Sequence, residues 1–253
     1  MILDAFGLSG RVALVTGAGR GIGRAAALAL AEAGADVFLV GKSGTVEGTR
    51  GEVEKLGRRA VALREDLSGM KAVGRVMEGV IGAYGQVDIL VNNAGIIRRA
   101  PAIEMTERDW DEVLGLNAKM SFFLAQAAAR DMVRRRRGKI INVASLTSFI
   151  GGLNIVSYTA SKGAVAQMTK ALCNEWAREG INVNGLAPGY IATDINKALR
   201  DDPVRFAELS ARIPAGRWGT PDDLKGAFVF LASAASDYVN GSLLVVDGGW
   251  MAW

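Results

Sequence analysis

Apolar residues occur along the chain in short unbroken runs that alternate with longer segments of helical composition. The runs are rich in β-branched residues and are bounded by Gly, Asp, Asn or Pro. An unbroken run of this kind is typical of a strand buried on both faces of a parallel sheet. The pattern predicts seven strands, at residues 11–16, 35–40, 60–64, 87–92, 139–145, 181–188 and 242–247.

The segments between most of these runs are helical in character. Residues 23–34, for example, are rich in Ala and Leu and end at a Gly, as helices often do. Repeated strand–helix alternation predicts an α/β fold, doubly wound, with a parallel sheet and helices on both faces. No linker or repeat interrupts the pattern, so we expect a single domain over residues 1–253.

Residues 190–220 depart from the alternation. They contain no strand pattern and carry two Pro and two Gly. An insertion at this end of a doubly wound sheet often covers the ligand crevice. We therefore expect this segment to cover the substrate.

Composition narrows the possible chemistry. The chain has no His and one Cys, Cys173, which excludes an internal disulfide and the Ser-His-Asp and Cys-His triads and argues against a zinc site. We expect no metal. The net charge of +4 is too small and too dispersed to indicate nucleic acid. Neither a membrane span nor a signal-peptide layout is present, which predicts a cytoplasmic protein.

Four glycines stand between the first predicted strand and the first helix, in "VALVTGAGRGIGRA". A sharp turn with backbone close to a phosphate needs residues without Cβ, and the following helix directs its positive dipole end at the anion. The spacing is G-x-x-x-G-x-G rather than the commoner G-x-G-x-x-G. A ligand-free Gly-rich turn has the same composition, but the position after the first strand favours nucleotide binding.

The end of the second strand bears on which nucleotide binds. An acid there would accept hydrogen bonds from the ribose 2′-OH of NAD, but the sequence "VFLVGKSG" has Gly41 at this point. Lys42, Ser43 and Arg20 could together hold a 2′-phosphate, which favours NADP(H). The alternative is that both cations are solvated surface charges.

Two further segments fit a nucleotide. Asp66, after the third strand, could accept from the adenine amino group. The segment "NNAG", residues 92–95, ends the fourth strand with small residues that suit close packing of backbone on a cofactor. An ordinary turn would have the same composition.

Tyr158 and Lys162 lie four positions apart in a predicted helix over residues 157–178, and therefore on one face. A free phenol has a pKa of ~10. A nearby ammonium and an oxidised nicotinamide would both lower that pKa, so Tyr158 could carry the proton that a histidine usually carries. The alternative is a packed ring with a lysine extending over it.

Two polar side chains complete the candidate chemistry. Ser145 ends the fifth strand, at the sheet edge that faces the ligand crevice, and could bind the reacting oxygen. Asn117, in the helical stretch after the fourth strand, could hold a water that links Lys162 to solvent. A buried Asn satisfied by backbone is the alternative.

Together these features resemble one family. "TGAGRGIG", "NNAG", Asn117, Ser145, "YTASK" and "PGYIAT" occur in the order typical of the short-chain dehydrogenase/reductase family, from about residue 8 to the C-terminus. The resemblance implies a Rossmann-type domain with a seven-stranded sheet, a homotetramer, and NAD(P)-dependent carbonyl–alcohol interconversion. It implies the catalytic set Asn117, Ser145, Tyr158 and Lys162.

The same resemblance extends the predicted cofactor site to the nicotinamide end, at "PGYIAT". The full predicted cofactor set is Gly17, Arg20, Gly21, Ile22, Gly23, Lys42, Ser43, Asp66, Leu67, Asn93, Ala94, Gly95, Tyr158, Lys162, Pro188, Gly189, Ile191 and Thr193.

Longer segments, "NNAGIIRRAPAIEM" and "IPAGRWGTPDDL" among them, resemble the branch of the family that dehydrogenates acidic sugars such as 2-dehydro-3-deoxy-D-gluconate or gluconate. That branch usually uses NAD, so both NAD and NADP stay open. An acidic substrate needs a cation, and a bidentate arginine suits it; solvated surface arginines are the alternative. The predicted substrate set is Arg98, Arg99, Ser145, Thr147, Tyr158 and Arg217.

Two other functions share parts of this pattern. A 3-oxoacyl-carrier-protein reductase, or a broad carbonyl reductase, would use the same chemistry, and a carrier protein would need a basic patch such as Arg98, Arg99 and residues 134–137. A nucleotide-binding regulator without catalysis would keep only the Gly loop. We interpret "RRRRGK" as a solvated helix end, and predict that the tail "DGGWMAW" packs against another subunit.

Overall fold

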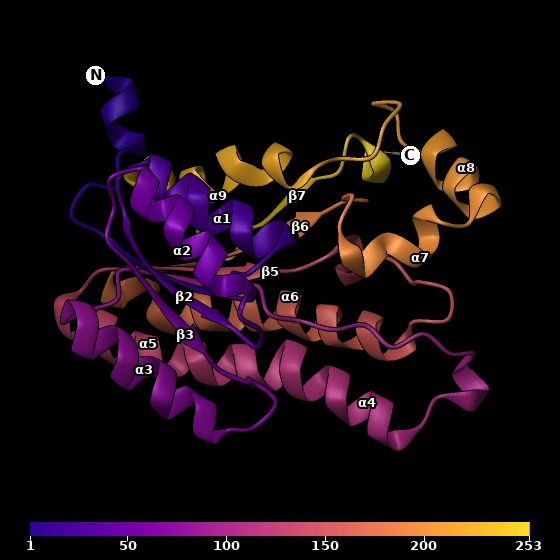
Figure 1. The fold of residues 1–253 in the computed structure, drawn as a ribbon, viewed down its shortest axis with the longest axis horizontal. Coiled ribbons are helices and arrows are strands. Elements are labelled where there is room, and N and C mark those ends of the chain that lie inside the picture. The colour runs from indigo at the N-terminus through magenta and orange to yellow at the C-terminus, as the bar shows by residue number, and fades with distance from the viewer. Residues whose placement is uncertain (253) are drawn as a thin grey trace.

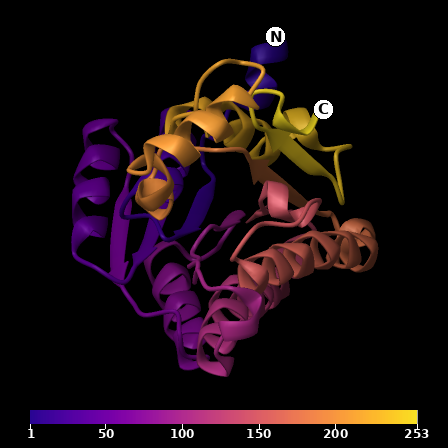
Figure 2. The same cartoon turned by 90° about the vertical axis from the view of Figure 1, so that its right-hand side faces the viewer.

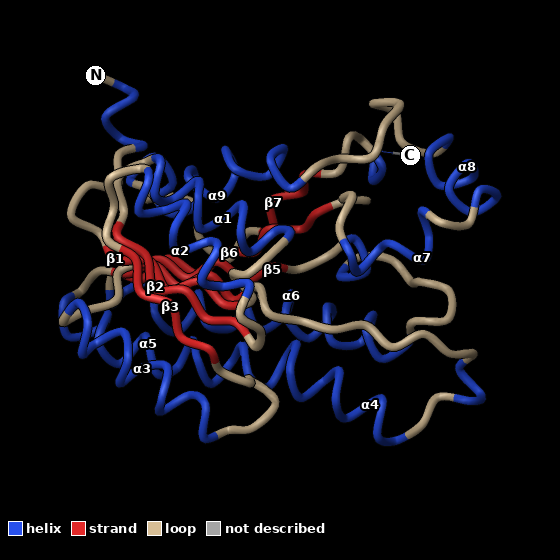
Figure 3. Tube along the Cα trace, in the orientation of Figure 1, coloured by secondary structure: helices blue, strands red, loops and turns tan. Residues whose placement is uncertain are grey.

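The computed structural model describes residues 1–252 and contains one seven-stranded parallel sheet in the order β3-β2-β1-β4-β5-β6-β7 (Figures 1 and 3). The predicted strands and fold class are confirmed, with bounds that shift by at most two residues. The strands are β1 (Val12–Thr16), β2 (Asp36–Gly41), β3 (Ala60–Arg64), β4 (Ile89–Asn92), β5 (Gly138–Val143), β6 (Ile181–Pro188) and β7 (Leu243–Val246).

Helices cover both faces of the sheet (Figure 1). One face carries α1 (Gly21–Glu32), α2 (Thr45–Lys55) and α9 (Lys225–Ala232), and the other carries α3 (Lys71–Tyr84), α5 (Ser121–Arg135) and α6 (Val156–Trp176). Each face has its own buried cluster of Val, Leu, Ile and Ala side chains. The strands lie between two apolar layers, which explains why their sequences do not alternate with polar residues.

The remaining helices are shorter. α4 (Glu107–Leu114) continues into α5 through a π-helical segment, Gly115–Met120. Two helices follow β6, α7 (Lys197–Arg200) and α8 (Pro203–Ala211). Short 3-10 helices span Ile2–Phe6, Ala102–Glu104, Leu146–Ser148, Ala177–Glu179, Asp194–Asn196, Pro221–Leu224, Ala234–Ser236 and Trp250–Ala252.

The strand order positions the site. The chain runs outward from β1 to β3, returns to β4 and then runs outward to β7 in the opposite direction. The carboxyl ends of β1 and β4 therefore meet where the order reverses, and this is where ligands bind in open α/β sheets. No helix within residues 1–252 is long and apolar enough to cross a membrane.

The segment that follows β6 forms a cover at this edge. Figure 2 views the molecule from the side on which α7 and α8 lie. Asp202 starts α8 by accepting hydrogen bonds from the backbone N–H groups of Val204 and Arg205 at 3.0 and 3.1 Å, and Pro203 occupies the first turn. This local chemistry explains why a stretch without strand pattern is ordered as helix. Residues 193–211 are called the cover below.

The arginine run is a solvated helix end at Arg134, Arg136 and Arg137, which are exposed, but not at Arg135. Arg135 is only 24% exposed and donates to Asp88 at 2.8 Å, and Arg137 contacts the same carboxylate at 3.2 Å. Asp88 is 3% exposed, and a buried carboxylate needs cationic or N–H partners. Arg134 and Arg136 pair with Asp131 and Glu179. Asp88 lies 47 and 49 residues before Arg135 and Arg137, so it could not be foreseen as their partner.

The C-terminal tail packs at least partly against its own chain. The Trp250 ring is buried, lies 4.7 Å from the Tyr190 ring centre, and has the Arg212 guanidinium 4.3 Å from its own centre. The apolar character of this part of the tail is therefore satisfied within the subunit. Trp253 lies outside the described residues.

Candidate active site

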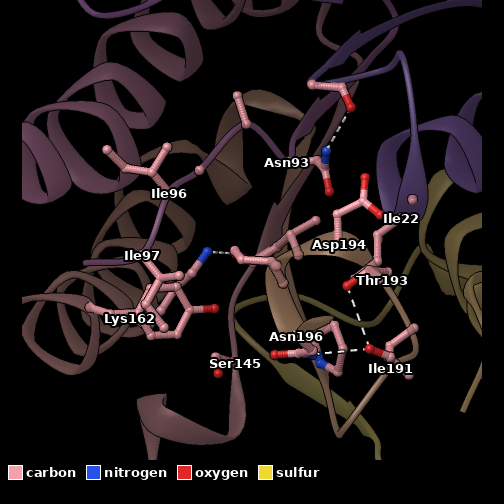
Figure 4. Close-up of a pocket in the computed structure, with 18 of the residues that line it drawn as sticks. Ile22, Asn93, Ile96, Ile97, Ser145, Lys162, Ile191, Thr193, Asp194 and Asn196 are labelled. Atoms are coloured by element: carbon pink, nitrogen blue, oxygen red, sulfur yellow. Dashed lines mark hydrogen bonds between the residues drawn. The ribbon is translucent and has the colours of Figure 1, made fainter. Parts of the chain in front are cut away.

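A cavity of about 860 Å³ lies at the carboxyl ends of the central strands. Its volume is in the range of small-molecule and cofactor sites. Figure 4 shows residues from one end of it to the other, with Lys162, Ile96 and Ile97 on one side of the view and Ile22, Thr193 and Asp194 on the other. The residues that line the cavity include both those of the Gly loop and the predicted reactive residues.

The Gly loop is packed so closely that it requires glycine. A Cβ on Gly17 would lie 2.7 Å from Nδ2 of Asn93, and a Cβ on Gly23 would collide with the carbonyl oxygen of Gly17. Gly21, at φ 54°, begins α1, whose first N–H groups have no partner inside the helix. The loop therefore fits the pyrophosphate of a dinucleotide, as the sequence predicts. Gly23 supports this loop from behind and does not itself line the cavity.

The "NNAG" segment holds the Gly loop in place. The Asn93 side chain donates to the carbonyl oxygen of Thr16 at 2.9 Å and more weakly to that of Gly17 at 3.3 Å. The Thr16 hydroxyl accepts from the N–H groups of Asn93 and Ala94 at 3.0 Å each. These bonds join the end of β4 to the end of β1. Asn93, Ala94 and Gly95 also line the cavity, where backbone could pack on a cofactor.

The side chains at the end of β2 are polar and exposed. Lys42 Nζ lies 2.8 Å from Oδ2 of Asp66, and the Ser43 and Thr45 hydroxyls are 2.8 Å apart. Because of the hydrogen bond from Lys42 and then that from Ser68, the pKa of Asp66 is below its usual value. The residues present fit a phosphorylated ribose: no carboxylate ends β2, and Leu67 forms an apolar wall nearby.

The predicted reactive residues Ser145, Tyr158 and Lys162 line the same cavity. Ser145 follows β5 and its hydroxyl accepts from the N–H of Thr147 at 3.2 Å, which orients the serine. Tyr158 and Lys162 project from the first two turns of α6. The structure therefore brings these three residues together from two segments of the chain.

Lys162 is held in an apolar setting. Its side chain is 5% exposed, and Nζ donates to the carbonyl oxygen of Val143 at 2.6 Å. Burial lowers the pKa of Lys162 to about 8, because removal from water disfavours the ammonium. The nitrogen lies 5.6 Å from the centre of the Tyr158 ring.

The sequence predicts that Lys162 lowers the pKa of Tyr158, but among the groups of this chain that pKa is raised. Burial raises the pKa of Tyr158, while the Ser145 hydroxyl and the Arg99 guanidinium oppose that rise. The Lys162 ammonium donates to the carbonyl oxygen of Val143 and not to the Tyr158 hydroxyl. Tyr158 is thus a protonated phenol near neutral pH unless a further cation lies beside it.

The Asn117 side-chain amide is fully hydrogen-bonded to protein groups and joins the backbone at Ile96 to α6. Its Nδ2 donates to the carbonyl oxygen of Ile96 at 2.9 Å and to the Ser161 hydroxyl at 3.0 Å, and its Oδ1 accepts from Ile96 N–H at 2.9 Å. Both amide protons are therefore taken by protein partners. The residue does not line the cavity, and the water that it was expected to hold stays a prediction.

The three predicted substrate arginines have different surroundings. Arg98 pairs with Glu112 at 2.8 Å, and Arg217 makes two bonds to Asp223 at 2.8 and 2.7 Å and lies outside the residues that line the cavity. Arg99 lines the cavity and has no carboxylate within 4.0 Å among residues 1–252. In that part of the chain, the only hydrogen bond of the Arg99 side chain is donated by Nη2 to the backbone carbonyl oxygen of Ile195, at 3.4 Å.

Arg99 and Tyr158 line the same cavity and affect each other's pKa. Burial lowers the pKa of Arg99, and the Tyr158 and Tyr190 hydroxyls oppose that change. Thr147, another predicted substrate residue, lines the cavity with a buried hydroxyl that has no hydrogen-bond partner within residues 1–252. The substrate end of the cavity therefore offers one unpaired cation and one unpaired hydroxyl close to the reactive groups.

Several lining residues were not foreseen from the sequence. Tyr190 lies inside "PGYIAT" and Trp250 in the apolar tail, so both were visible as unusual aromatic positions, whereas Leu153, Arg205 and Leu209 carry no recognisable pattern. Within residues 1–252, no group of three or more His, Cys, Asp or Glu residues could hold a metal ion.

Comparison with known proteins agrees with this geometry. Residues 17–251 match a family model of short-chain dehydrogenases that is described as enoyl-(acyl carrier protein) reductase. The chain is 50% identical to the 2-dehydro-3-deoxy-D-gluconate 5-dehydrogenase of Escherichia coli K12, over all of both chains.

Solved structures are similar over almost the whole length. One from Beutenbergia cavernae, named as an NAD(P)-dependent gluconate 5-dehydrogenase with bound NADP at low occupancy, is 48% identical over 98% of this chain and 100% of that one, with a TM-score of 0.95. A gluconate 5-dehydrogenase from Burkholderia cenocepacia J2315, in complex with NADP and tartrate, is 45% identical over 100% of both chains, with a TM-score of 0.96.

Proposed function

The chain belongs to the short-chain dehydrogenase/reductase family, and we propose that it interconverts a keto group and a secondary alcohol on an acidic sugar, of the 2-dehydro-3-deoxy-D-gluconate or gluconate type. The observation that carries this proposal is the position of Arg99. Among residues 1–252 this cavity arginine has no carboxylate partner, and it shares the cavity with Tyr158. An unpaired guanidinium in a cleft is suited to a substrate carboxylate.

The reaction follows from the protein groups present. Hydride transfer to or from the substrate carbon is the chemistry that a bound nicotinamide cofactor would supply in this cavity. In reduction, Tyr158 gives its phenol proton to the substrate oxygen, and in oxidation it takes that proton back. Ser145, oriented by the Thr147 N–H, donates a hydrogen bond to the same oxygen and holds it at the tyrosine.

The raised pKa of Tyr158 bears on the two directions differently. A protonated phenol is ready to act as an acid, so reduction needs no further change. Oxidation needs a phenolate, and the positive charge of an oxidised nicotinamide would favour that form. Lys162, with its ammonium at the wall of the cavity, would bind the nicotinamide ribose.

NADP is the cofactor that the side chains favour. No acid ends β2 to bind a free 2′-OH, and Arg20, Lys42 and Ser43 line the cavity where a 2′-phosphate would lie. The two solved relatives described above contain NADP. The tartrate in one of them is a small hydroxy acid, which is the substrate chemistry proposed here.

The test is a spectrophotometric screen of keto-sugar acids against the corresponding neutral keto-sugars, with NADPH and NADH side by side. We expect turnover of the acids with a preference for NADPH, and kcat/KM at least ~10-fold lower for neutral analogues, because each lacks a charged hydrogen bond of about 1.5–3 kcal/mol. Equal turnover of acids and neutral sugars would contradict the assignment.

A 3-oxoacyl-carrier-protein reductase is less well supported. The arginines that would form the docking patch are engaged: residues 134–137 contact Asp131, Asp88 and Glu179, and Arg98 contacts Glu112. Acyl thioesters in the same screen test this alternative. A purely regulatory role would leave the complete set of Ser145, Tyr158 and Lys162 without a purpose.

We further propose a homotetramer, as the family resemblance implies, made of one folded domain per subunit and located in the cytoplasm. The outer edge of β7 (Leu243–Val246) pairs with no strand within residues 1–252, and such an edge is commonly covered by a neighbour. Sedimentation would give the oligomeric state, and a single cooperative thermal transition would support the single domain.

A further inference from the structure

One ion pair in the cavity joins segments that are far apart in the sequence. Arg20, in the Gly loop, donates from Nη1 to Oδ2 of Asp194 at 2.9 Å. Asp194 belongs to the first turn of the cover, which follows β6 after the short segment 189–192. The two segments pack closely, because a Cβ on Gly21 would lie 3.4 Å from Cγ2 of Thr193. Figure 4 shows Thr193 and Asp194 beside Ile22, in the first turn of α1.

The turn that presents Asp194 is ordered by its own hydrogen bonds. The Asn196 side chain donates to the carbonyl oxygen of Ile191 at 3.0 Å, and Arg200 donates to that of Thr193 at 3.3 Å. The Asp194 carboxylate is therefore held toward the Gly loop by a structured turn, although the pair itself is open to solvent, with Arg20 76% and Asp194 64% exposed.

Both cations assigned to a 2′-phosphate already contact a carboxylate. Lys42 pairs with Asp66 and Arg20 pairs with Asp194. A 2′-phosphate that accepts from Nη1 of Arg20 must displace the Asp194 carboxylate, which already accepts from that nitrogen at 2.9 Å. A dinucleotide without the 2′-phosphate leaves the Arg20–Asp194 pair undisturbed. The two cofactors should therefore respond differently to the presence of Asp194.

We propose that Asp194 is a specificity-determining residue that occupies Arg20 and thereby narrows the preference of the enzyme for NADPH over NADH. The proposal rests on the proposed function only in requiring that a nicotinamide dinucleotide binds in this cavity. Through Asp194, the cover would contribute to cofactor selectivity as well as lying beside the substrate.

The test is a double-mutant cycle on nucleotide binding, measured by NADPH and NADH fluorescence without substrate. Asp194→Asn should tighten NADPH by about two- to fivefold, the scale of an exposed ion pair, and leave NADH unchanged. In an Arg20→Met background the same change should have no effect. Calorimetric titration with 2′,5′-ADP and 5′-AMP should repeat the contrast without the nicotinamide.

Asp201→Asn is the matched control, because it removes another exposed carboxylate of the cover that pairs with Lys197 and not with Arg20. It should leave the NADPH-to-NADH ratio of dissociation constants unchanged. The proposal is overturned if Asp194→Asn shifts both nucleotides equally, shifts neither, or still acts in the Arg20→Met background. Failure of the wild-type chain to bind either nucleotide would instead refute the proposed function, and the present inference with it.

Discussion

The two ends of the cavity are built differently. The cofactor end is formed by backbone, by glycines that cannot carry a Cβ, and by Asn93, which ties β4 to β1. The substrate end is formed by side chains from the 96–99 segment, α6 and the cover. At the cofactor end both cations contact carboxylates, whereas at the substrate end Arg99 has none within residues 1–252. Affinity for the cofactor is therefore distributed over many groups, and selectivity for the substrate depends on few.

The sharpest way to separate the two ends is Tyr158→Phe. The change removes the phenol proton and leaves the ring, so we expect kcat to fall by about 10³-fold or more, at the upper part of the range for general acid–base groups. NADPH affinity, measured by fluorescence titration, should change by less than about twofold, because the cofactor end is untouched. A variant that keeps a tenth of wild-type kcat would show that Tyr158 is not the proton carrier.

Arg99→Met tests the dependence of the substrate end on a single cation. We expect kcat/KM for a sugar acid to fall by about 10- to 100-fold, as for loss of one charged hydrogen bond, and that for a neutral analogue to change little. Arg108→Ala removes the same charge from the exposed surface of α4 and serves as the control. If both variants lose activity equally, general electrostatics and not a specific contact explains the effect.

The smallest effect is expected in the pH dependence of stability. Burial lowers the pKa of Lys162 from 10.5 to about 8, so between these values the unfolded chain binds more protons at this site than the folded chain. Its contribution to the free energy of unfolding should therefore increase as pH rises from about 8 toward 10.5. Denaturant unfolding at several pH values should show that the gain in free energy of unfolding of Lys162→Met over wild type decreases across this window. If the two free energies change with pH in parallel, the pKa shift of Lys162 is contradicted.

The contrast between a cofactor end formed by backbone and a substrate end formed by side chains also explains what the sequence could predict. The strands and the Gly loop follow from local patterns, because burial on both faces and close backbone packing constrain each residue where it stands. Ser145, Tyr158 and Lys162 line one cavity, and their positions at a strand end and on one helix face follow from the same local patterns. The family membership followed from these elements and their order.

The pairing of charged side chains could not be predicted in the same way. Arg217 is held by Asp223, six residues later, and Lys162 by a carbonyl 19 residues earlier. Choosing Arg99 over Arg98 and Arg217 requires knowing which carboxylates the helices bring near, and that depends on packing. The π-helical turn at Asn117 also left no sign in a sequence that is compatible with an ordinary helix.

Asn117 has a consequence for the neighbouring arginine. Its amide accepts a hydrogen bond from the N–H of Ile96 and donates one to the carbonyl oxygen of the same residue. It donates a third to the Ser161 hydroxyl on α6. Arg99 is only three residues further along. Asn117 therefore fixes the backbone on both sides of Ile96, and this restricts where the nearby Arg99 guanidinium can lie.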